Sequence, residues 1–117
     1  MRNMVKDRIE VIILGEKWII EQRSEIDDAA LENADGYCDK TARLIAVTVR
    51  RKDADLIDFE KYQRKVLRHE IIHAFLFESG LAECWTHDQG HDESYGDWIA
   101  AQWPKIAKVF AAAGVAE

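Results

Sequence analysis

The most informative segment of this chain is residues 67–78, which read Leu67-Arg68-His69-Glu70-Ile71-Ile72-His73-Ala74-Phe75-Leu76-Phe77-Glu78. Placed on a helix, its apolar side chains lie nearly all round the axis, so we expect a central, buried helix. The helix is predicted to run from about Phe59 to Ser79. Asp55 or Asp58 can cap its start, and Gly80 is well placed to end it in a left-handed conformation.

Two histidines stand four residues apart in this segment, with a glutamate directly after the first. His69 and His73 would share one face of the helix, with Cβ atoms about 5–6 Å apart, which lets both imidazoles bind one metal ion. Glu70 lies one step round the helix, where it can reach a water on the metal without binding the metal itself. This H-E-x-x-H arrangement is typical of zinc sites whose glutamate acts as the general base.

The alternative interpretation of this turn is that the pattern is accidental and the two histidines are merely solvated or hydrogen-bonded. Against it, two histidines and a glutamate inside an apolar helix would carry unpaired polar atoms, at about 1–3 kcal/mol each. A metal ion and its water would satisfy all three side chains together. Zinc is the predicted cofactor on ligand type and availability, and manganese or nickel stays open as the alternative ion.

A catalytic zinc needs a third protein ligand and one open position, and the residues after the helix hold the candidates. These candidates are Glu83, His87, Asp88, His91, Asp92 and Glu93. Glu93 is favoured because Asp97 follows it by four, so both would point the same way from a second helix. Asp97 could then accept the spare N–H of a ligand histidine. The alternative is that Glu93 and Asp97 form an acidic first helical turn, which the helix dipole favours.

The chain contains HEIIH at residues 69–73 and, after nineteen intervening residues, Glu93-Ser94-Tyr95-Gly96-Asp97. This pattern resembles the gluzincin zinc metallopeptidases of thermolysin type. The resemblance covers residues 67–98. It implies His69, His73 and Glu93 as zinc ligands, Glu70 as general base and Asp97 as the residue that orients a ligand. The short chain looks more like the minimal single-domain members, the minigluzincins. The sequences of residues 66–81 and 97–106 are also similar to short proteins carried by bacteria and their phages.

The chain departs from the larger gluzincins, whose second domain supplies a histidine or tyrosine to the oxyanion. This chain is too short for that domain. Tyr95, His87 and His91 are the nearby substitutes for oxyanion or substrate contacts, and none can be assigned from the sequence. The predicted activity is hydrolysis of a peptide or protein substrate by a zinc-activated water. The alternative is a catalytically silent or latent zinc-binding interaction module of a phage or prophage.

The N-terminal half predicts strands. Residues 9–14 and 17–21 suggest a hairpin whose type II′ turn begins at Gly15, and Tyr37–Asp39 suggests a short strand. Leu44–Arg50 alternates between apolar and other positions, which predicts a half-buried strand at a sheet edge, where an extended substrate would pair. Residues 24–34 are expected to be a loop or a short helix, and Asp35-Gly36 is expected to be a turn.

The second helix is predicted to start near residues 90–92. Its apolar stripe comprises Trp98, Ile99, Trp103, Ile106, Val109 and Phe110. Pro104 should kink or divide this helix, and the tail 111–117 should fray. The expected fold is therefore a single α+β domain over residues 1–117. In it, a small antiparallel or mixed sheet of about three strands precedes the zinc-binding helix and a second, proline-kinked helix.

The composition excludes several classes of partner. A net charge of −6 over 117 residues argues against a nucleic acid or an anionic membrane as the main partner. No apolar run approaches the length of a membrane span, and no signal peptide is recognisable, so the cytoplasm is the expected location. Cys38 and Cys84 are then expected to be free thiols. The oligomeric state stays open.

Overall fold

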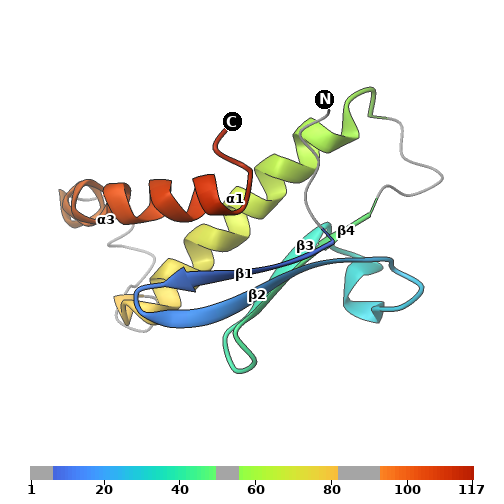
Figure 1. Cartoon of the computed structure of the whole chain (residues 1–117), viewed down its shortest axis with the longest axis horizontal. Coiled ribbons are helices and arrows are strands. Elements are labelled where there is room, and N and C mark those ends of the chain that lie inside the picture. The colour runs from blue at the N-terminus through green and yellow to red at the C-terminus, as the bar shows by residue number, and fades with distance from the viewer. Residues whose placement is uncertain (1–6, 50–55, 82–92) are drawn as a thin grey trace.

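The computed structural model describes residues 7–49, 56–81 and 93–117, apart from the side chains of residues 93–97 and 100. It confirms the α+β class, with a four-stranded mixed sheet rather than one of about three strands. The strands are β1 (Arg8–Ile13), β2 (Glu16–Arg23), β3 (Gly36–Asp39) and β4 (Leu44–Thr48). Helices α1 (Phe59–Glu78) and α3 (Glu93–Ala112) both lie on one face of this sheet (Figure 1).

The strand order is β1-β2-β4-β3, with β2 and β4 parallel and the other neighbours antiparallel. Strand β4 is therefore an interior strand, and the prediction that it forms an edge was wrong. Its residues 45–48 are all buried, on both faces of the sheet, so the prediction of a half-buried strand was wrong as well. Alternating hydropathy indicates which way side chains point, but it carries no information about which strands become neighbours.

The β1–β2 turn differs by one residue from the predicted one. Ile13 pairs with Glu16, so the two turn residues are Leu14 and Gly15, with φ of 49° and 88°. Positive φ at both central residues defines a type I′ turn, not a type II′ turn beginning at Gly15. The type I′ turn follows the right-handed twist of the flanking strands, and this outweighs the strain at Leu14.

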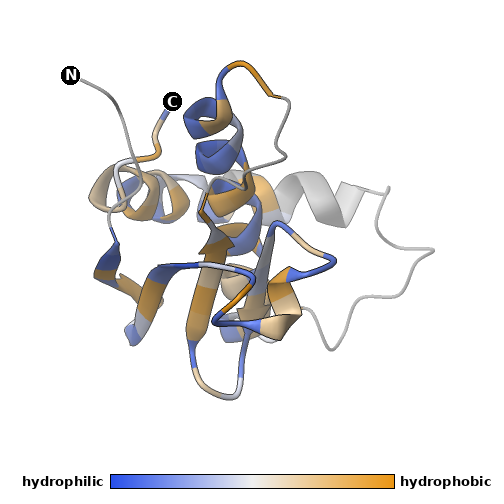
Figure 2. Ribbon diagram, turned by 90° about the vertical axis from the view of Figure 1, so that its right-hand side faces the viewer, coloured by the Kyte–Doolittle hydropathy of each residue, from blue (hydrophilic) through white to orange (hydrophobic). Residues whose placement is uncertain are grey.

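Helix α1 begins and ends as the sequence predicts. The Oδ1 atom of Asp58 accepts the Lys61 N–H at 3.0 Å, and Gly80 follows the last turn with φ of 81°. The predicted burial is only partly right, because Lys61, Lys65 and His69 are exposed. The helix buries one face, and Figure 2 shows that hydrophobic residues are also frequent in the strands of the sheet. The principal buried residues of this face are Leu67, Ile71, Ala74 and Phe75.

The start of α1 is tied to the sheet by polar side chains. The Tyr62 hydroxyl donates a hydrogen bond to Oδ2 of Asp35. The buried Gln63 donates through Nε2 to the Thr48 carbonyl oxygen at 2.9 Å and to Oε1 of Gln22 at 2.8 Å. These bonds fix the register of the helix against β2 and β4.

The end of α1 is tied to the sheet by one carboxylate. Trp18, fully buried in β2, donates its indole N–H to Oε1 of Glu78 at 2.9 Å. The same oxygen accepts the Arg43 Nε–H from the β3–β4 connection. Trp18 is thus a core residue, and its one polar atom is satisfied by the last residue of α1.

Helix α3 is continuous over Glu93–Ala112, so Pro104 does not divide it. From the predicted apolar stripe, Ile106, Val109 and Phe110 are buried, whereas Trp103 is 51% exposed. Among the residues that the structure describes, no helix is long and apolar enough to cross a membrane.

The tail after α3 is docked, and the prediction that it frays was wrong. Val115 is fully buried, and its N–H donates to the Phe110 carbonyl oxygen at 2.9 Å. Arg68 Nη1 donates to the Val115 carbonyl oxygen and Arg64 Nε to that of Glu117, each at 3.0 Å. The small apolar residues of the tail complete the core instead of leaving it.

The segment between β2 and β3 is a turn followed by one turn of 3-10 helix, η1 (Ala29–Leu31). The Asp27 N–H bonds Oγ of Ser24 at 3.2 Å, and Asp28 caps η1 by accepting the Ala30 N–H. Both sequence alternatives, loop and short helix, are thus present in succession.

Candidate metal centre

His69 and His73 lie on successive turns of α1, and their rings turn toward each other. The two Nε2 atoms are 3.1 Å apart, and the ring planes meet at 72°. Two nitrogens bound to one tetrahedral zinc at 2.0–2.1 Å would lie about 3.3 Å apart. The imidazoles therefore converge on one point at close to the separation that a shared metal ion requires.

The same contact can form a hydrogen bond if one ring presents its N–H to the lone pair of the other. Metal binding needs a lone pair on both Nε2 atoms. Burial, and then the neighbouring His69, lower the pKa of His73. The neutral form of His73, which retains a lone pair, is thus favoured at neutral pH.

Glu70 leaves the helix toward β3 and is 8% exposed. Burial raises the pKa of its carboxyl, and the charge of His69 opposes this rise only in part. The carboxyl faces a cavity of about 300 Å³ between α1 and β3. The residues lining it are Asp35, Gly36, Tyr62, Lys65, Val66, His69 and Glu70. A carboxylate of raised pKa beside two imidazoles has the character of a general base.

Gly36 allows α1 to approach β3 closely. A Cβ at this position would lie 2.8 Å from Val66 Cγ1 and 3.4 Å from Glu70 Cγ. Gly36 was predicted to form a turn with Asp35, but it is the first residue of β3. The missing side chain is needed because a helix packs against this strand, which local sequence does not reveal.

Cys38 lies in β3 close to the same carboxyl. It is a free thiol, as predicted, whereas Cys84 lies outside the described residues. Burial, followed by the charges of Glu70 and Asp39, raises the pKa of the Cys38 thiol to about 12. At neutral pH, with no metal bound, Cys38 is therefore protonated and is a poor nucleophile.

The predicted third ligand lies in α3. Glu93 is the first residue of this helix and Asp97 is one turn further on, but their side chains, like that of Tyr95, are outside the described part of the structure. His87 and His91 also lie outside the described residues. Within residues 7–49, 56–81 and 98–117, no group of three or more His, Cys, Asp or Glu side chains could hold a metal ion. Glu93 therefore stays a prediction.

Tyr62 and Lys65 were not singled out from the sequence, yet both line the cavity. Lys65 precedes His69 by four residues, so helical spacing alone could have placed it on the same face. Tyr62 stands one turn before Val66, and its position at the cavity depends on the long-range bond to Asp35.

Comparison with protein-family models, with characterised proteins and with solved structures found no match. The resemblance to gluzincins therefore depends on the motif residues between 67 and 98.

Proposed function

We propose that this chain is a zinc-dependent, metallopeptidase-like protein that hydrolyses peptide bonds. The observation that carries the proposal is the convergence of two Nε2 atoms, 3.1 Å apart, beside the buried carboxyl of Glu70. That carboxyl opens into a cavity against the outer strand of the sheet. Base, ligand pair and substrate space thus meet along one side of α1.

The donor set suits zinc, because imidazole nitrogens and a carboxylate oxygen are its usual ligands. His69 and His73 would hold the ion, with Glu93 as the proposed third ligand. Bound zinc would polarise the scissile carbonyl and make a water molecule at the site more acidic. Glu70, whose pKa burial raises, would take the proton from that water and give it to the leaving amine.

The substrate strand is better placed along β3 than along β4, which is interior. The Thr48 N–H bonds the Asp35 carbonyl oxygen at 2.9 Å, so Asp35 and Thr48 form a hydrogen-bonded pair. Hydrogen-bonded and non-bonded pairs alternate in an antiparallel ladder, so the main-chain groups of Gly36 and Cys38 point away from β4. An extended peptide could pair with these groups beside Glu70.

The proposal is tested by elemental analysis of the purified protein together with cleavage of a fluorogenic peptide library. We expect about one zinc per chain, and cleavage that a hydroxamate, which binds active-site zinc, inhibits. Cleavage that persists after complete zinc removal would overturn the proposal. Stoichiometric zinc without any cleavage would favour the silent interaction module instead.

A further inference from the structure

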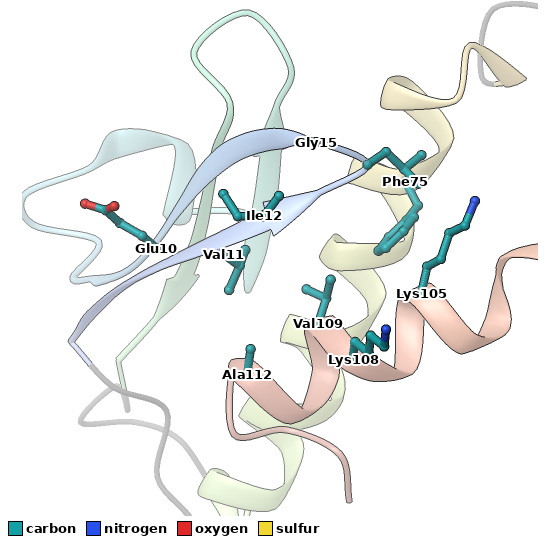
Figure 3. A pocket seen from close by; sticks show the side chains of 10 residues that line it. Glu10, Val11, Ile12, Gly15, Phe75, Lys105, Lys108, Val109 and Ala112 are labelled. Carbon is teal, nitrogen blue, oxygen red and sulfur yellow. The ribbon is translucent and has the colours of Figure 1, made fainter.

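A second hollow lies at the opposite edge of the sheet, between β1 and α3. Its volume is about 750 Å³. Its lining residues are Glu10, Val11, Ile12, Leu14, Gly15, Phe75, Lys105, Lys108, Val109 and Ala112. The floor is apolar, because Val11, Phe75 and Val109 are all buried core residues (Figure 3). None of these residues lines the cavity of the proposed zinc site.

One wall of this β1–α3 groove is main chain. Glu10, Val11 and Ile12 are consecutive residues, and consecutive side chains of a strand point to opposite faces. All three can line one groove only if the edge of the strand itself forms the wall. Figure 3 shows the Glu10 carboxylate pointing away from α3, which agrees with this arrangement.

The hydrogen-bonding groups of this wall point outward. The Gln22 N–H bonds the Asp7 carbonyl oxygen at 2.9 Å, so Asp7 and Gln22 form a hydrogen-bonded pair. Because such pairs alternate along the ladder, Glu10 and Ile12 direct their N–H and C=O groups away from β2. β1 has no second neighbour among the strands that the structure describes. These groups are thus available to an added strand.

Two positively charged side chains line the groove. Lys105 and Lys108 come from α3, line the hollow and are exposed. Neither ammonium group has an ion-pair partner among the described residues. In a chain of net charge −6, this local pair of lysines favours an acidic ligand.

We propose that β1 binds an extended acidic peptide segment as a fifth strand of the sheet. The ligand's main chain pairs with Glu10 and Ile12, its apolar side chains cover the groove floor, and its carboxylates face Lys105 and Lys108. Main-chain pairing supplies affinity and the lysines supply selectivity for acidic sequences, as in other strand-addition sites. This site is independent of zinc and of the proposed catalysis.

The charge component is tested by fluorescence anisotropy with two labelled hexapeptides, Glu-Val-Val-Glu-Val-Val and its counterpart with lysine in place of glutamate. The period of three places a charged residue on each face of the extended peptide. We expect the wild type to prefer the acidic peptide and the double variant K105E/K108E to bind it about tenfold more weakly. Equal binding of both peptides, or an unchanged affinity of the double variant, would overturn the proposal.

The main-chain component is tested at Ile12. The variant Ile12→Pro removes the outward N–H, which an edge strand tolerates, together with the isoleucine side chain, whereas Ile12→Thr changes the side chain and keeps the N–H. We expect the proline variant, if folded by circular dichroism, to lose the acidic peptide and the threonine variant to retain it. Unchanged binding by a folded proline variant would contradict strand addition.

The occupant of the edge is tested by analytical ultracentrifugation. A wild-type dimer that K105E/K108E dissociates would show that a second copy of the chain occupies the edge, which also overturns the proposal.

Discussion

The two outer strands of the sheet present the same kind of main-chain edge, but the helices beside them make the two edges chemically different. At β3, helix α1 brings two converging imidazoles and the buried Glu70. At β1, helix α3 brings two lysines over an apolar floor. Backbone geometry thus supplies a pairing surface at each side, and the neighbouring helix determines which chemical groups lie beside that surface.

The largest expected effect is loss of zinc at the β3 edge with no change in peptide binding at the β1 edge. Replacing either histidine, by His69→Ala or His73→Ala, should reduce bound zinc from about one per chain to near zero, because one imidazole cannot hold the ion with the remaining ligands. Elemental analysis measures this change. Lys61→Ala, on an exposed position of the same helix, is the control. Binding of the acidic hexapeptide at β1 should not change in any of these variants; a parallel loss would mean that the two edges are coupled.

The next effect sharpens the role of the β3 edge. Glu70→Gln keeps the size of the side chain but cannot take a proton, so turnover of a cleaved peptide should fall by about 10²–10⁴-fold while zinc is retained. Steady-state kinetics and elemental analysis on the same sample measure both quantities. Glu60→Gln makes the same substitution in the first turn of α1 and should leave turnover unchanged. Normal turnover in Glu70→Gln would remove Glu70 from the mechanism.

A smaller effect concerns the contact that brings α1 against β3. Gly36→Ala should destabilise the protein by about 1–3 kcal/mol, because the new methyl group would overlap Val66 Cγ1. Urea unfolding followed by circular dichroism measures the loss. The double variant G36A/V66A should recover part of the stability, since it removes the opposing methyl groups. If Gly36→Ala were as stable as the wild type, the close approach of helix and edge strand would be wrong.

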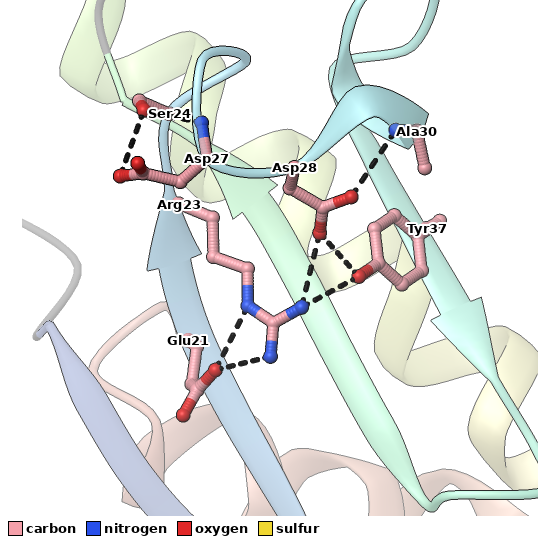
Figure 4. A network of polar contacts seen from close by, with 7 residues as sticks. All are labelled: Glu21, Arg23, Ser24, Asp27, Asp28, Ala30 and Tyr37. Atoms are coloured by element: carbon pink, nitrogen blue, oxygen red, sulfur yellow. Dashed lines mark hydrogen bonds and ion pairs between the residues drawn. The ribbon is translucent and has the colours of Figure 1, made fainter.

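The smallest expected effect concerns the polar network that braces the β3 edge. Arg23 of β2 donates to Glu21, to Oδ2 of Asp28 and to the Tyr37 hydroxyl, and Tyr37 donates to the same Asp28 oxygen (Figure 4). The hydrogen bond from Tyr37, and then that from Arg23, lower the pKa of Asp28. A carboxyl whose pKa is lower in the folded than in the unfolded state stabilises the fold above the unfolded value, near 3.9. That contribution disappears as the pH falls through the folded value.

Asp28→Asn should therefore flatten the loss of stability between about pH 5 and pH 3, with a difference of no more than about 1 kcal/mol. Unfolding free energies measured across this range test it. Asp27→Asn, at a neighbouring carboxyl that instead accepts from Ser24, is the control. Parallel stability curves for the wild type and Asp28→Asn would show that the network does not depend on this carboxylate.

Local signals predicted the helix that carries the site. Asp58 and Gly80 fix the ends of α1, and the spacing of His69, Glu70 and His73 places them along neighbouring turns, because caps and helical periodicity act within a few residues. The α+β class also followed from the order of strands and helices. Hydropathy alternation could not predict the sheet order, since strand neighbours are chosen by contacts between distant segments.

The same limit explains what was missed around the site. Gly36 is needed only because α1 packs against β3, and Tyr62 reaches the cavity through its bond to Asp35, twenty-seven residues away. The docking of the tail through Val115 likewise depends on Arg68, forty-seven residues earlier. Each of these features depends on a contact between two distant elements. The sequence pattern of one element alone does not show which other element it will contact.

Helix α1 is fastened to the sheet near both its ends, by Tyr62 and Gln63 at the first and by Glu78 at the last. Because hydrogen bonds hold both ends of α1 to the sheet, the helix cannot move away from it, and the gap beside Glu70 is fixed when the protein folds. A molecule entering that gap would meet groups that are already in position, and little of its binding free energy would be consumed in ordering them.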